Sequence, residues 1–246
     1  MVEPSIFERM STYASLNQND VVLDIGAGFG FLTRFLAKKC RSVLAVESDA
    51  RLVEALREQL KNSPNAKTIR GNVLKVLISD FNKVVSIPPY HISSPLLLWL
   101  SNKKFDCTVL VFQKEFAERV VASIGSEDYG WLSVLAYYHF EVELLDDVPK
   151  WMFYPQPKVD SIVVQLKPRK PPFKLKNDVL FKQMVQSLFT QRNRKVRNAI
   201  LPFLKGIRGF TTENTDELVE ALPFHDRRVR KLAPEDFGAL ANAVSD

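Results

Sequence analysis

The sequence contains few of the residues that build disulfide frameworks and metal centres. It has two cysteines, Cys40 and Cys107, and three histidines in 246 residues. The cysteines are far apart and lie among apolar neighbours, which indicates neither a disulfide framework nor a zinc site. His91, His139 and His225 have no second histidine and no carboxylate at a useful spacing, so we interpret them as structural and expect no metal.

Long apolar runs are also missing. The chain has no stretch of about 18 apolar residues, which a membrane-spanning helix needs, and no charged leader followed by an apolar segment. Its 46% of hydrophobic residues suffices for a core, and 246 residues suffice for one sizeable domain plus a small one. We therefore expect a globular, cytoplasmic protein without a membrane partner.

Negative charge is scarce in one part of the chain. Between Pro168 and Gly209, eleven Lys or Arg residues accompany one acid, Asp178, so this segment has a local charge of +10. The whole chain has a net charge of +6, and the remainder is therefore net negative. Basic residues gathered in one segment predict a polyanionic partner, for which RNA or DNA is the natural candidate.

The most informative stretch is a glycine-rich turn after the apolar run Val21–Ile25. Gly26, Gly28 and Gly30 occupy every second position, so a ligand can approach the backbone closely. Their spacing differs from the G-x-G-x-x-G of dinucleotide-binding proteins. It suits S-adenosylmethionine (AdoMet), whose amino-acid part carries no pyrophosphate. A tight turn without a ligand is the alternative interpretation.

An acidic residue after the next apolar run strengthens the prediction of a nucleotide-like ligand. Glu47 ends the run Val43–Glu47 and lies 21 residues after Gly26. At this distance from the glycine turn, a carboxylate can accept hydrogen bonds from both hydroxyls of a ribose.

Apolar runs alternate with helical patterns in the first half of the chain. The predicted helices are Pro4–Ala14, Phe31–Lys39 and Ala50–Lys61, and the predicted strands are Val21–Ile25, Val43–Glu47, Lys83–Ile87 and Cys107–Phe112. Between the last two strands we expect a helix with Ser94 as N-cap and Pro95 at its first position. This alternation predicts a mostly parallel sheet that is covered on both faces.

The pattern changes after Val120. We predict a loop at Gly125–Gly130, a helix at Trp131–Tyr138 and two strands of an antiparallel edge at Phe140–Leu144 and Ser161–Leu166. Lys167–Pro172 can neither continue a strand nor begin a helix, which predicts two domains, residues 1–167 and 173–246. From Asp178 onward the chain is predicted to be helical, with breaks near Pro202, Gly206–Gly209, Pro223 and Pro234.

A second informative stretch, Ile87-Pro88-Pro89-Tyr90, directly follows a predicted strand. It resembles the N-P-P-Y or N-L-P-Y motif of methylases that act on the exocyclic amine of adenine. In that chemistry an amide oxygen and a prolyl carbonyl accept from the amine, while the tyrosine stacks on the base. Proximity and electrostatics then supply most of the catalysis. A rigid Pro-Pro turn followed by a core tyrosine is the alternative.

The wider run Val84–Pro95 is similar to the N-L-P-Y-N-I-S-S-P segment of the small-subunit ribosomal RNA adenine dimethyltransferases, the KsgA-type family, with archaeal character. Further stretches that match in the same order are Glu115–Arg119, Asp128–Val134, Phe153–Ser161, Gln191–Asn198 and Arg230–Phe237. The resemblance implies a Rossmann-like class I AdoMet-dependent methyltransferase with a small C-terminal helical domain. It also implies dimethylation of N6 of two adjacent adenosines near the 3′ end of small-subunit rRNA, on an assembling subunit, by a monomer.

The same resemblance assigns roles to residues. Gly26, Gly28 and Gly30 would surround the amino-acid part of AdoMet, and Glu47 would hold its ribose. Asn72 stands where the family usually has an aspartate for the adenine amine, and it can still accept a hydrogen bond without charge assistance. The predicted cofactor site also includes Asp24, Ser48, Val73 and Ile87.

The catalytic residues implied by the resemblance are Ile87, Pro88, Tyr90 and Phe153, with Tyr90 and Phe153 on either side of the target base. A core position is the alternative for Phe153. Ile87 departs from the family, which has asparagine there, so the Pro88 carbonyl alone would polarise the amine. Losing one such contact costs about 3 kcal/mol, or about a hundredfold in rate. In a regular strand Ser86 points to the opposite side and is a poor substitute.

We therefore expect a slow methyltransferase, with a catalytically silent ribosome-assembly factor as the first alternative and a methylase of large-subunit RNA or DNA as the second. A basic helix with Arg192, Arg194, Lys195 and Arg197 is predicted to bind RNA, and contact with the core domain through hydrogen bonds is its alternative role. Met1–Pro4 resembles the end of a Q-x-F-L segment that precedes the first helix in the family, so we expect a native chain that starts earlier.

Overall fold

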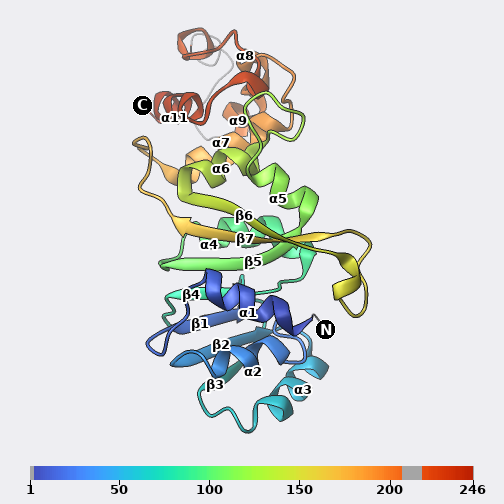
Figure 1. The fold of residues 1–246 in the computed structure, drawn as a ribbon. Helices are drawn as coiled ribbons and strands as arrows, with labels where there is room; N and C mark the ends of the chain where they lie inside the picture. Colours follow the sequence, from blue (N-terminus) through green and yellow to red (C-terminus); the bar gives the residue numbers. More distant parts are fainter. Residues whose placement is uncertain (1–2, 207–217, 246) are drawn as a thin grey trace. The chain divides into compact units, whose positions relative to one another are not determined.

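The computed structural model describes residues 3–206 and 218–245, so Met1, Val2 and most of the predicted break at Gly206–Gly209 lie outside the described residues. The chain divides into two compact units (Figure 1). Unit 1 comprises Met1–Ala117 and Phe140–Pro168, and unit 2 comprises Glu118–His139 and Arg169–Asp246. A single boundary at Lys167–Pro172 does not describe this division, because Glu118–His139 groups with the C-terminal helices. Two independent domains remain a prediction.

The described part of unit 1 is built on a seven-stranded sheet with the order β3-β2-β1-β4-β5-β7-β6. Its strands are β1 (Val21–Ile25), β2 (Ser42–Glu47), β3 (Ala66–Arg70), β4 (Lys83–Ser86), β5 (Cys107–Gln113), β6 (Phe140–Val148) and β7 (Ser161–Pro168). Strands β1 to β5 pair in parallel, whereas β7 is antiparallel to β5 and to β6. The predicted parallel sheet with an antiparallel edge is confirmed.

Helices cover the sheet of unit 1. They are α1 (Pro4–Tyr13), α2 (Phe31–Ala37), α3 (Ala50–Leu60), the 3-10 turn η1 (Tyr90–Ile92), α4 (Ser93–Leu100), the first residues of α5 (Lys114–Val120) and the 3-10 turn η2 (Lys150–Met152). All residues of β4 and nearly all of β1 and β5 are buried. Since successive residues of a strand point to opposite faces, this burial confirms that both faces are covered.

One face of the sheet packs against α1 and α2. Ile6, Phe7 and Met10 of α1 and Leu32 and Leu36 of α2 form one apolar cluster with buried valines from β1, β2, β4, β5 and β7. The positions in α1 follow the three-to-four residue spacing of a helix face, which is why the sequence predicts this helix correctly. This packing fixes Phe7 near the carboxyl ends of the parallel strands, where it lies beside the glycine turn.

The order of the strands determines where a ligand can bind. From β1 the chain passes through α2 to β2 and then to β3, and it returns to β4 on the other side of β1. The connections after β1 and β4 therefore run in opposite directions and leave a crevice outside the carboxyl ends of these two strands. The glycine turn and the segment Ile87–Tyr90 both begin at this crevice.

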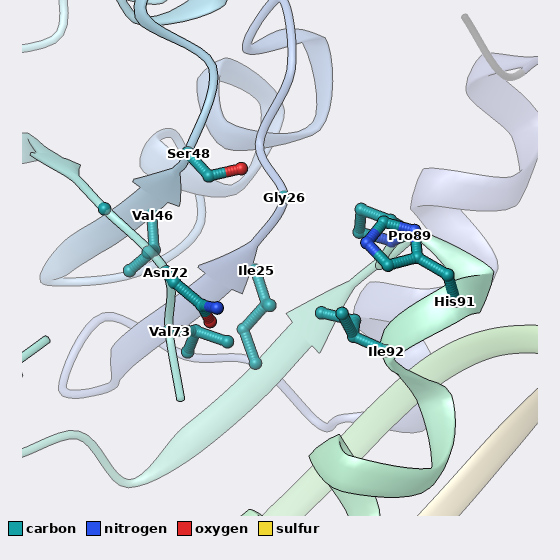
Figure 2. Close-up of a pocket in the computed structure, with 10 residues that line it drawn as sticks. Ile25, Gly26, Val46, Ser48, Asn72, Val73, Pro89, His91 and Ile92 are labelled. Atoms are coloured by element: carbon teal, nitrogen blue, oxygen red, sulfur yellow. The ribbon is translucent and has the colours of Figure 1, made fainter. Parts of the chain in front are cut away.

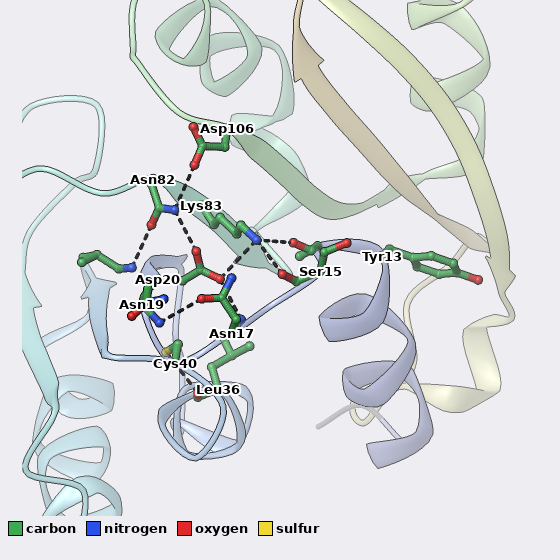
Figure 3. Close-up of polar contacts among 12 residues, drawn as sticks. Tyr13, Ser15, Asn17, Asn19, Asp20, Leu36, Cys40, Asn82, Lys83 and Asp106 are labelled. Carbon is green, nitrogen blue, oxygen red and sulfur yellow. Dashed lines mark hydrogen bonds and ion pairs between the residues drawn. The ribbon is translucent and has the colours of Figure 1, made fainter.

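The opposite, amino-terminal edge of the sheet is closed by a polar network (Figure 3). Nζ of Lys83 donates to the carbonyl oxygens of Ala14 and Ser15, each at 2.7 Å, and lies 3.1 Å from the Asp20 carboxylate. Asn82 donates to Asp20 at 2.8 Å and accepts from the backbone N–H of Val21 at 2.8 Å. These bonds attach the end of α1 to β1 and β4.

Some element ends differ from the predictions. β7 continues through Lys167 and Pro168, which pair with Glu141 and Phe140, because proline is tolerated at the end of a strand. α4 begins at Ser93 rather than after a Ser94 cap, since η1 already turns the chain before it. β3 and α5 are not among the predicted elements. In β3 only Ile69 is strongly apolar, and it is half-buried.

The described part of unit 2 is helical. It contains the end of α5, α6 (Trp131–His139), α7 (Asp178–Phe189), α8 (Val196–Ala199), α9 (Leu201–Gly206), the 3-10 turn η3 (Val229–Lys231) and α11 (Pro234–Val244). Its aromatic core includes Tyr129, Phe181 and Phe237, and the Tyr129 hydroxyl donates to the Leu232 carbonyl at 2.9 Å. None of the helices among residues 3–206 and 218–245 combines the length and the apolar character that crossing a membrane requires.

Candidate active site

The glycine turn between β1 and α2 requires its glycines for two different reasons. Gly26, Gly28 and Gly30 have φ values of +71°, +55° and +80°, in the left-handed region that favours glycine. A Cβ on Gly26 would also lie 2.6 Å from Cδ of Pro89, and one on Gly30 would lie 2.5 Å from Cδ1 of Leu56. A Cβ on Gly28 would meet only open space and a carbonyl at 3.9 Å. Close packing therefore explains Gly26 and Gly30, and Gly28 leaves its side of the turn open.

Glu47 at the end of β2 holds the glycine turn. Its Oε2 accepts from the backbone N–H of Gly28 at 2.9 Å, and its Oε1 accepts from the N–H groups of Ser48 at 2.7 Å and Asp49 at 2.9 Å. The side chain is buried. The Ser48 hydroxyl also donates to Oε1, at 3.4 Å. A carboxylate oxygen has about two acceptor positions, and Oε2 uses one of them for Gly28, which leaves one position on Oε2 for a ligand hydroxyl.

Asp24 lies in β1, just before the turn, and is 1% exposed. Its Oδ2 accepts from the Thr33 hydroxyl at 2.7 Å. Burial, together with the charge of Glu47, raises the pKa of Asp24 to about 7, even though the Thr33 bond lowers it. A cationic ligand would stabilise the ionised form of this buried carboxyl group, because a nearby positive charge lowers the pKa of a carboxyl group.

A first pocket of about 400 Å³, including space open to solvent, lies at the carboxyl ends of β1 and β2. Figure 2 shows Pro89, His91 and Ile92 on one side of it, facing residues at the ends of the strands. The residues that line it are Ile25, Gly26, Val46, Ser48, Gly71, Asn72, Val73, Pro89, His91 and Ile92. Four predicted cofactor residues, Gly26, Ser48, Asn72 and Val73, thus share one pocket.

Two residues of the first pocket change the sequence-based interpretation. The Asn72 side-chain oxygen already accepts from the backbone N–H of Leu74 at 2.9 Å, which fixes the amide beside the pocket. His91, interpreted as structural, lines this pocket. No sequence spacing indicates His91, because the 3-10 turn η1 rather than a motif brings it there.

A second pocket, of about 680 Å³ including space open to solvent, lies on the other side of Gly26. Its lining residues are Phe7, Asp24, Gly26, Ala27, Gly28, Phe29, Phe31, Leu32, Ile87 and Phe153. Ile87 and Phe153, which are 66 positions apart in the chain, therefore line one pocket beside the glycine turn. Gly30, by contrast, lines neither pocket.

The neighbours of Ile87 have distinct positions. Ser86 is fully buried in β4, and its hydroxyl has no hydrogen-bond partner among the described residues, so it does not replace the missing asparagine. Pro88 is buried, and Tyr90 is half-buried at the start of η1. The Tyr90 and Ser161 hydroxyls lie 2.6 Å apart, so β7 holds the ring of Tyr90. Burial raises the pKa of Tyr90, although the bond to Ser161 lowers it.

The four predicted RNA-binding residues of unit 2 differ in their contacts. Arg192 donates to the carbonyl oxygens of Ser126 and Glu127, at 2.9 and 2.6 Å. Lys195 and Arg197 share the Asp226 carboxylate, at 3.0 and 2.8 Å. Arg194 is exposed.

The predicted basic helix is wrong for three of these four residues, whereas Arg197 lies in α8. Arg192 and Arg194 lie in the turn before α8, and Lys195 forms an isolated β-bridge with Arg228 that keeps this part of the chain extended. A long-range bridge of this kind has no signal in the local sequence.

The contacts of His139 and His225, both in unit 2, do not contradict their interpretation as structural residues, but His139 has a carboxylate nearby that sequence spacing does not indicate. His139 lies 3.6 Å from the Asp178 carboxylate, 39 positions away in the chain, and its pKa is lowered to about 4 by burial and by the charge of Lys182. His225 lies 3.1 Å from the Leu222 carbonyl. Sequence spacing could not reveal the Asp178 partner because the fold supplies it.

The fold and the crevice are those of the Rossmann-like class I methyltransferases. The crystal structure of a dimethyladenosine transferase from Plasmodium falciparum has a TM-score of 0.81 and 27% sequence identity, and the match covers 98% of this chain and 95% of that one. The structure of the 23S rRNA methyltransferase ErmE has a TM-score of 0.67 and 27% identity, with 99% and 98% covered. The predicted fold class is confirmed.

Within this class, the profile of the family described as ribosomal RNA adenine dimethylase matches residues 1–242. The probable ribosomal RNA small subunit methyltransferase A of Methanosarcina acetivorans is 38% identical over 248 residues, which cover 100% of this chain and 91% of that protein. This chain therefore belongs to the ribosomal RNA adenine dimethylase family. The resemblance inferred from its motifs, and with it the expectation of an rRNA adenine methyltransferase, is confirmed.

Proposed function

We propose that this protein transfers methyl groups from AdoMet to N6 of two adjacent adenosines near the 3′ end of small-subunit rRNA, acting on an assembling subunit. The observation that carries the proposal is the second pocket. It brings the first residue of the Ile87–Tyr90 motif, the aromatic ring of Phe153 and the open side of the glycine turn to one place. A base that enters beside Ile87 would face a ligand held by Gly26 and Gly28.

The residues at the crevice fit AdoMet. The open face at Gly28 admits the amino-acid part close to the backbone, and the buried carboxyl group of Asp24 at the same pocket suits its ammonium group. Oε2 of Glu47 retains one acceptor position for a ribose hydroxyl, and Asn72 and Val73 in the first pocket suit the adenine. When bound, AdoMet supplies an electrophilic methyl group on a sulfonium.

The chain's own residues orient the acceptor amine. The Pro88 carbonyl would accept from it, and Tyr90, held by Ser161, and Phe153 would stack on the base. Ile87 offers no acceptor, so the reaction depends on positioning and on a single carbonyl. A silent assembly factor gains no support from the relatives' names, and the Ile87 substitution is its sole basis.

Contact with the rest of the rRNA would use unit 2. Arg194 is the best placed of the four basic residues, since Arg192 already donates to carbonyls while Lys195 and Arg197 share one carboxylate. Binding through phosphate contacts should weaken steeply as the salt concentration rises.

Radiolabelled methyl transfer to under-methylated small subunits tests the proposal, with large subunits and duplex DNA as control substrates. We expect label in small-subunit rRNA and in neither control. Ile87→Asn should raise kcat by up to about a hundredfold, because an amide oxygen then shares the polarisation of the amine with the Pro88 carbonyl. Ile87→Val is the matched control and should leave kcat close to wild type.

The outcomes separate the proposal from its alternatives. Methyl transfer to large subunits or to DNA, with none to small subunits, would show that large-subunit RNA or DNA is the substrate instead. Binding of AdoMet in isothermal titration without transfer, even for Ile87→Asn, would favour the assembly factor. No AdoMet binding would refute the cofactor assignment.

A further inference from the structure

Three exposed aromatic side chains of unit 1 lie on two segments that contribute residues to the second pocket. Among the described residues, the aromatic side chains classed as exposed are Phe29, Trp151 and Tyr154, at 56%, 65% and 77% exposure. Phe29 lines the second pocket, and Trp151 and Tyr154 flank Phe153, which lines it too. Single exposed hydrophobic residues are normal on a protein surface, but one exposed ring that lines the pocket and two more in the loop that carries Phe153 indicate a binding surface.

The loop that carries Trp151 and Tyr154 is well anchored, so loose packing does not explain their exposure. The backbone N–H of Lys150 donates to the Asp160 carboxylate at 2.9 Å, and the Met152 carbonyl accepts from the N–H of Glu3 at 3.2 Å. Met152 and Phe153 pack against the apolar cluster of the sheet. The same anchored turn therefore directs one aromatic ring into the pocket and leaves two outside.

The charge of this loop suits a polyanion. Residues 149–159 contain Lys150 and Lys158, both exposed, and no acidic residue. Asp160, which follows, accepts from the Lys150 backbone. Exposed aromatic rings beside lysines are the combination that binds unpaired nucleic acid, because every base has a face that can stack and every linkage carries a phosphate.

We propose that Trp151 and Tyr154 form a stacking surface for the unpaired nucleotides next to the target adenosine, with Lys150 and Lys158 on the adjoining phosphates. This inference rests on the proposed function for the identity of the target. It adds that the loop between β6 and β7 holds the neighbours of the target base, so the enzyme recognises a single-stranded segment rather than one extruded base.

The first experiment measures binding of a fluorescently labelled unpaired RNA of about ten nucleotides, which is within the range that one stacking surface binds. Trp151→Ala and Tyr154→Ala should each raise the Kd about tenfold. Trp151→Phe, which keeps a ring, should bind nearly as well as wild type, whereas Trp151→Leu should bind as weakly as Trp151→Ala. Leu77→Ala, at a 99% exposed site elsewhere, is the matched control and should not change the Kd.

Salt dependence separates the rings from the lysines. Trp151→Ala should leave the slope of log Kd against log salt unchanged, while Lys158→Ala should reduce this slope by about one. In methyl transfer, Trp151→Ala should raise the KM for under-methylated subunits and leave AdoMet affinity unchanged.

Unchanged RNA binding in both alanine variants would overturn the inference, and so would equal RNA affinity of Trp151→Phe and Trp151→Leu. A third contrary result would be alanine variants that bind intact subunits more weakly but free RNA normally, because the two rings would then contact a ribosomal protein instead of RNA. Failure of the proposed function is distinct, because it would appear as a wild-type protein that binds RNA through Trp151 and transfers no methyl group.

Discussion

Two buried aspartates, four positions apart at the two ends of β1, have opposite surroundings. Asp20, at the amino-terminal end, is paired with Lys83 and accepts from Asn82, and these contacts lower its pKa although burial alone would raise it. Asp24, at the carboxyl end, has the Thr33 hydroxyl as a partner and the Glu47 charge nearby, and burial raises its pKa to about 7.

The two ends of the sheet therefore have different roles. At the amino-terminal edge the chain provides its own cation and fills the space with hydrogen bonds, which stabilises the fold. At the carboxyl edge it buries a carboxyl group beside a pocket, where, on the proposed function, a cationic ligand would supply the counter-charge. The polar groups of the first edge serve stability, and those of the second are proposed to serve binding.

The largest effect should come from breaking the amino-terminal edge. Lys83→Met leaves Asp20 buried without its cation, so we expect the free energy of unfolding to fall by about 3–5 kcal/mol. Urea unfolding followed by circular dichroism measures this change. The double variant Asp20→Asn/Lys83→Met removes both charges and should be more stable than Lys83→Met alone. If the two variants were equally stable, the unpaired charge of Asp20 would not explain the lower stability of Lys83→Met.

At the carboxyl edge, by contrast, Asp24→Asn should raise the free energy of unfolding above about pH 7. Because the pKa of Asp24 is raised when folded, the native protein binds more protons than the unfolded chain between about pH 4 and pH 7. Its contribution to stability is therefore present at low pH and is lost as the pH rises through about 7. The variant should match wild type near pH 4 and be the more stable protein above pH 7, as measured by urea unfolding across this range.

The same variant should bind AdoMet about tenfold more weakly at neutral pH, because a charged hydrogen bond to the ammonium group is lost. In wild type, AdoMet affinity should rise as the pH approaches 7, where Asp24 ionises, and the variant should lack this rise. Isothermal titration checks both. Asp20→Asn, at the other end of the strand, is the control and should show the wild-type pH dependence of AdoMet affinity. The same pH dependence in Asp24→Asn would contradict the proposed contact of Asp24 with the ammonium group.

The smallest effect should come from Ser161→Ala, which releases the Tyr90 hydroxyl. We expect kcat/KM for methyl transfer to fall about fivefold, the value of one neutral hydrogen bond, with AdoMet affinity unchanged. Ser161→Thr keeps a hydroxyl and should restore the rate. Tyr90→Phe should cost a similar factor, and the double variant should cost no more than either single one. Additive losses would show that the two hydroxyls act separately.

Local patterns predicted much of the fold. The apolar run Val21–Ile25, the glycine turn and the helix face of α1 depend on neighbours within a few positions, so the sequence shows them directly. The missed strand β3 is half exposed and lacks a continuous apolar run. The continuation of β7 through Pro168 depends on its partner β6, which no local pattern contains.

The candidate site was predicted less completely. Ser48, Asn72 and Val73 were expected at the cofactor, and they share a pocket because strand ends meet at one edge of a parallel sheet. Phe7 and His91 line the two pockets without any motif, since helix packing and a 3-10 turn bring them there. The Tyr90–Phe153 pair around a base stays a prediction.

The chemical types at the site can be read from the residues alone: glycines where the backbone must be approached, carboxylates beside them, and isoleucine in place of asparagine. Which aspartate pairs with a lysine and which lies at a pocket, and that Ile87 and Phe153 line the same pocket, follow from the fold. Residue type sets which bonds a side chain can form, whereas burial and neighbours from distant strands set whether the chain itself supplies the partner.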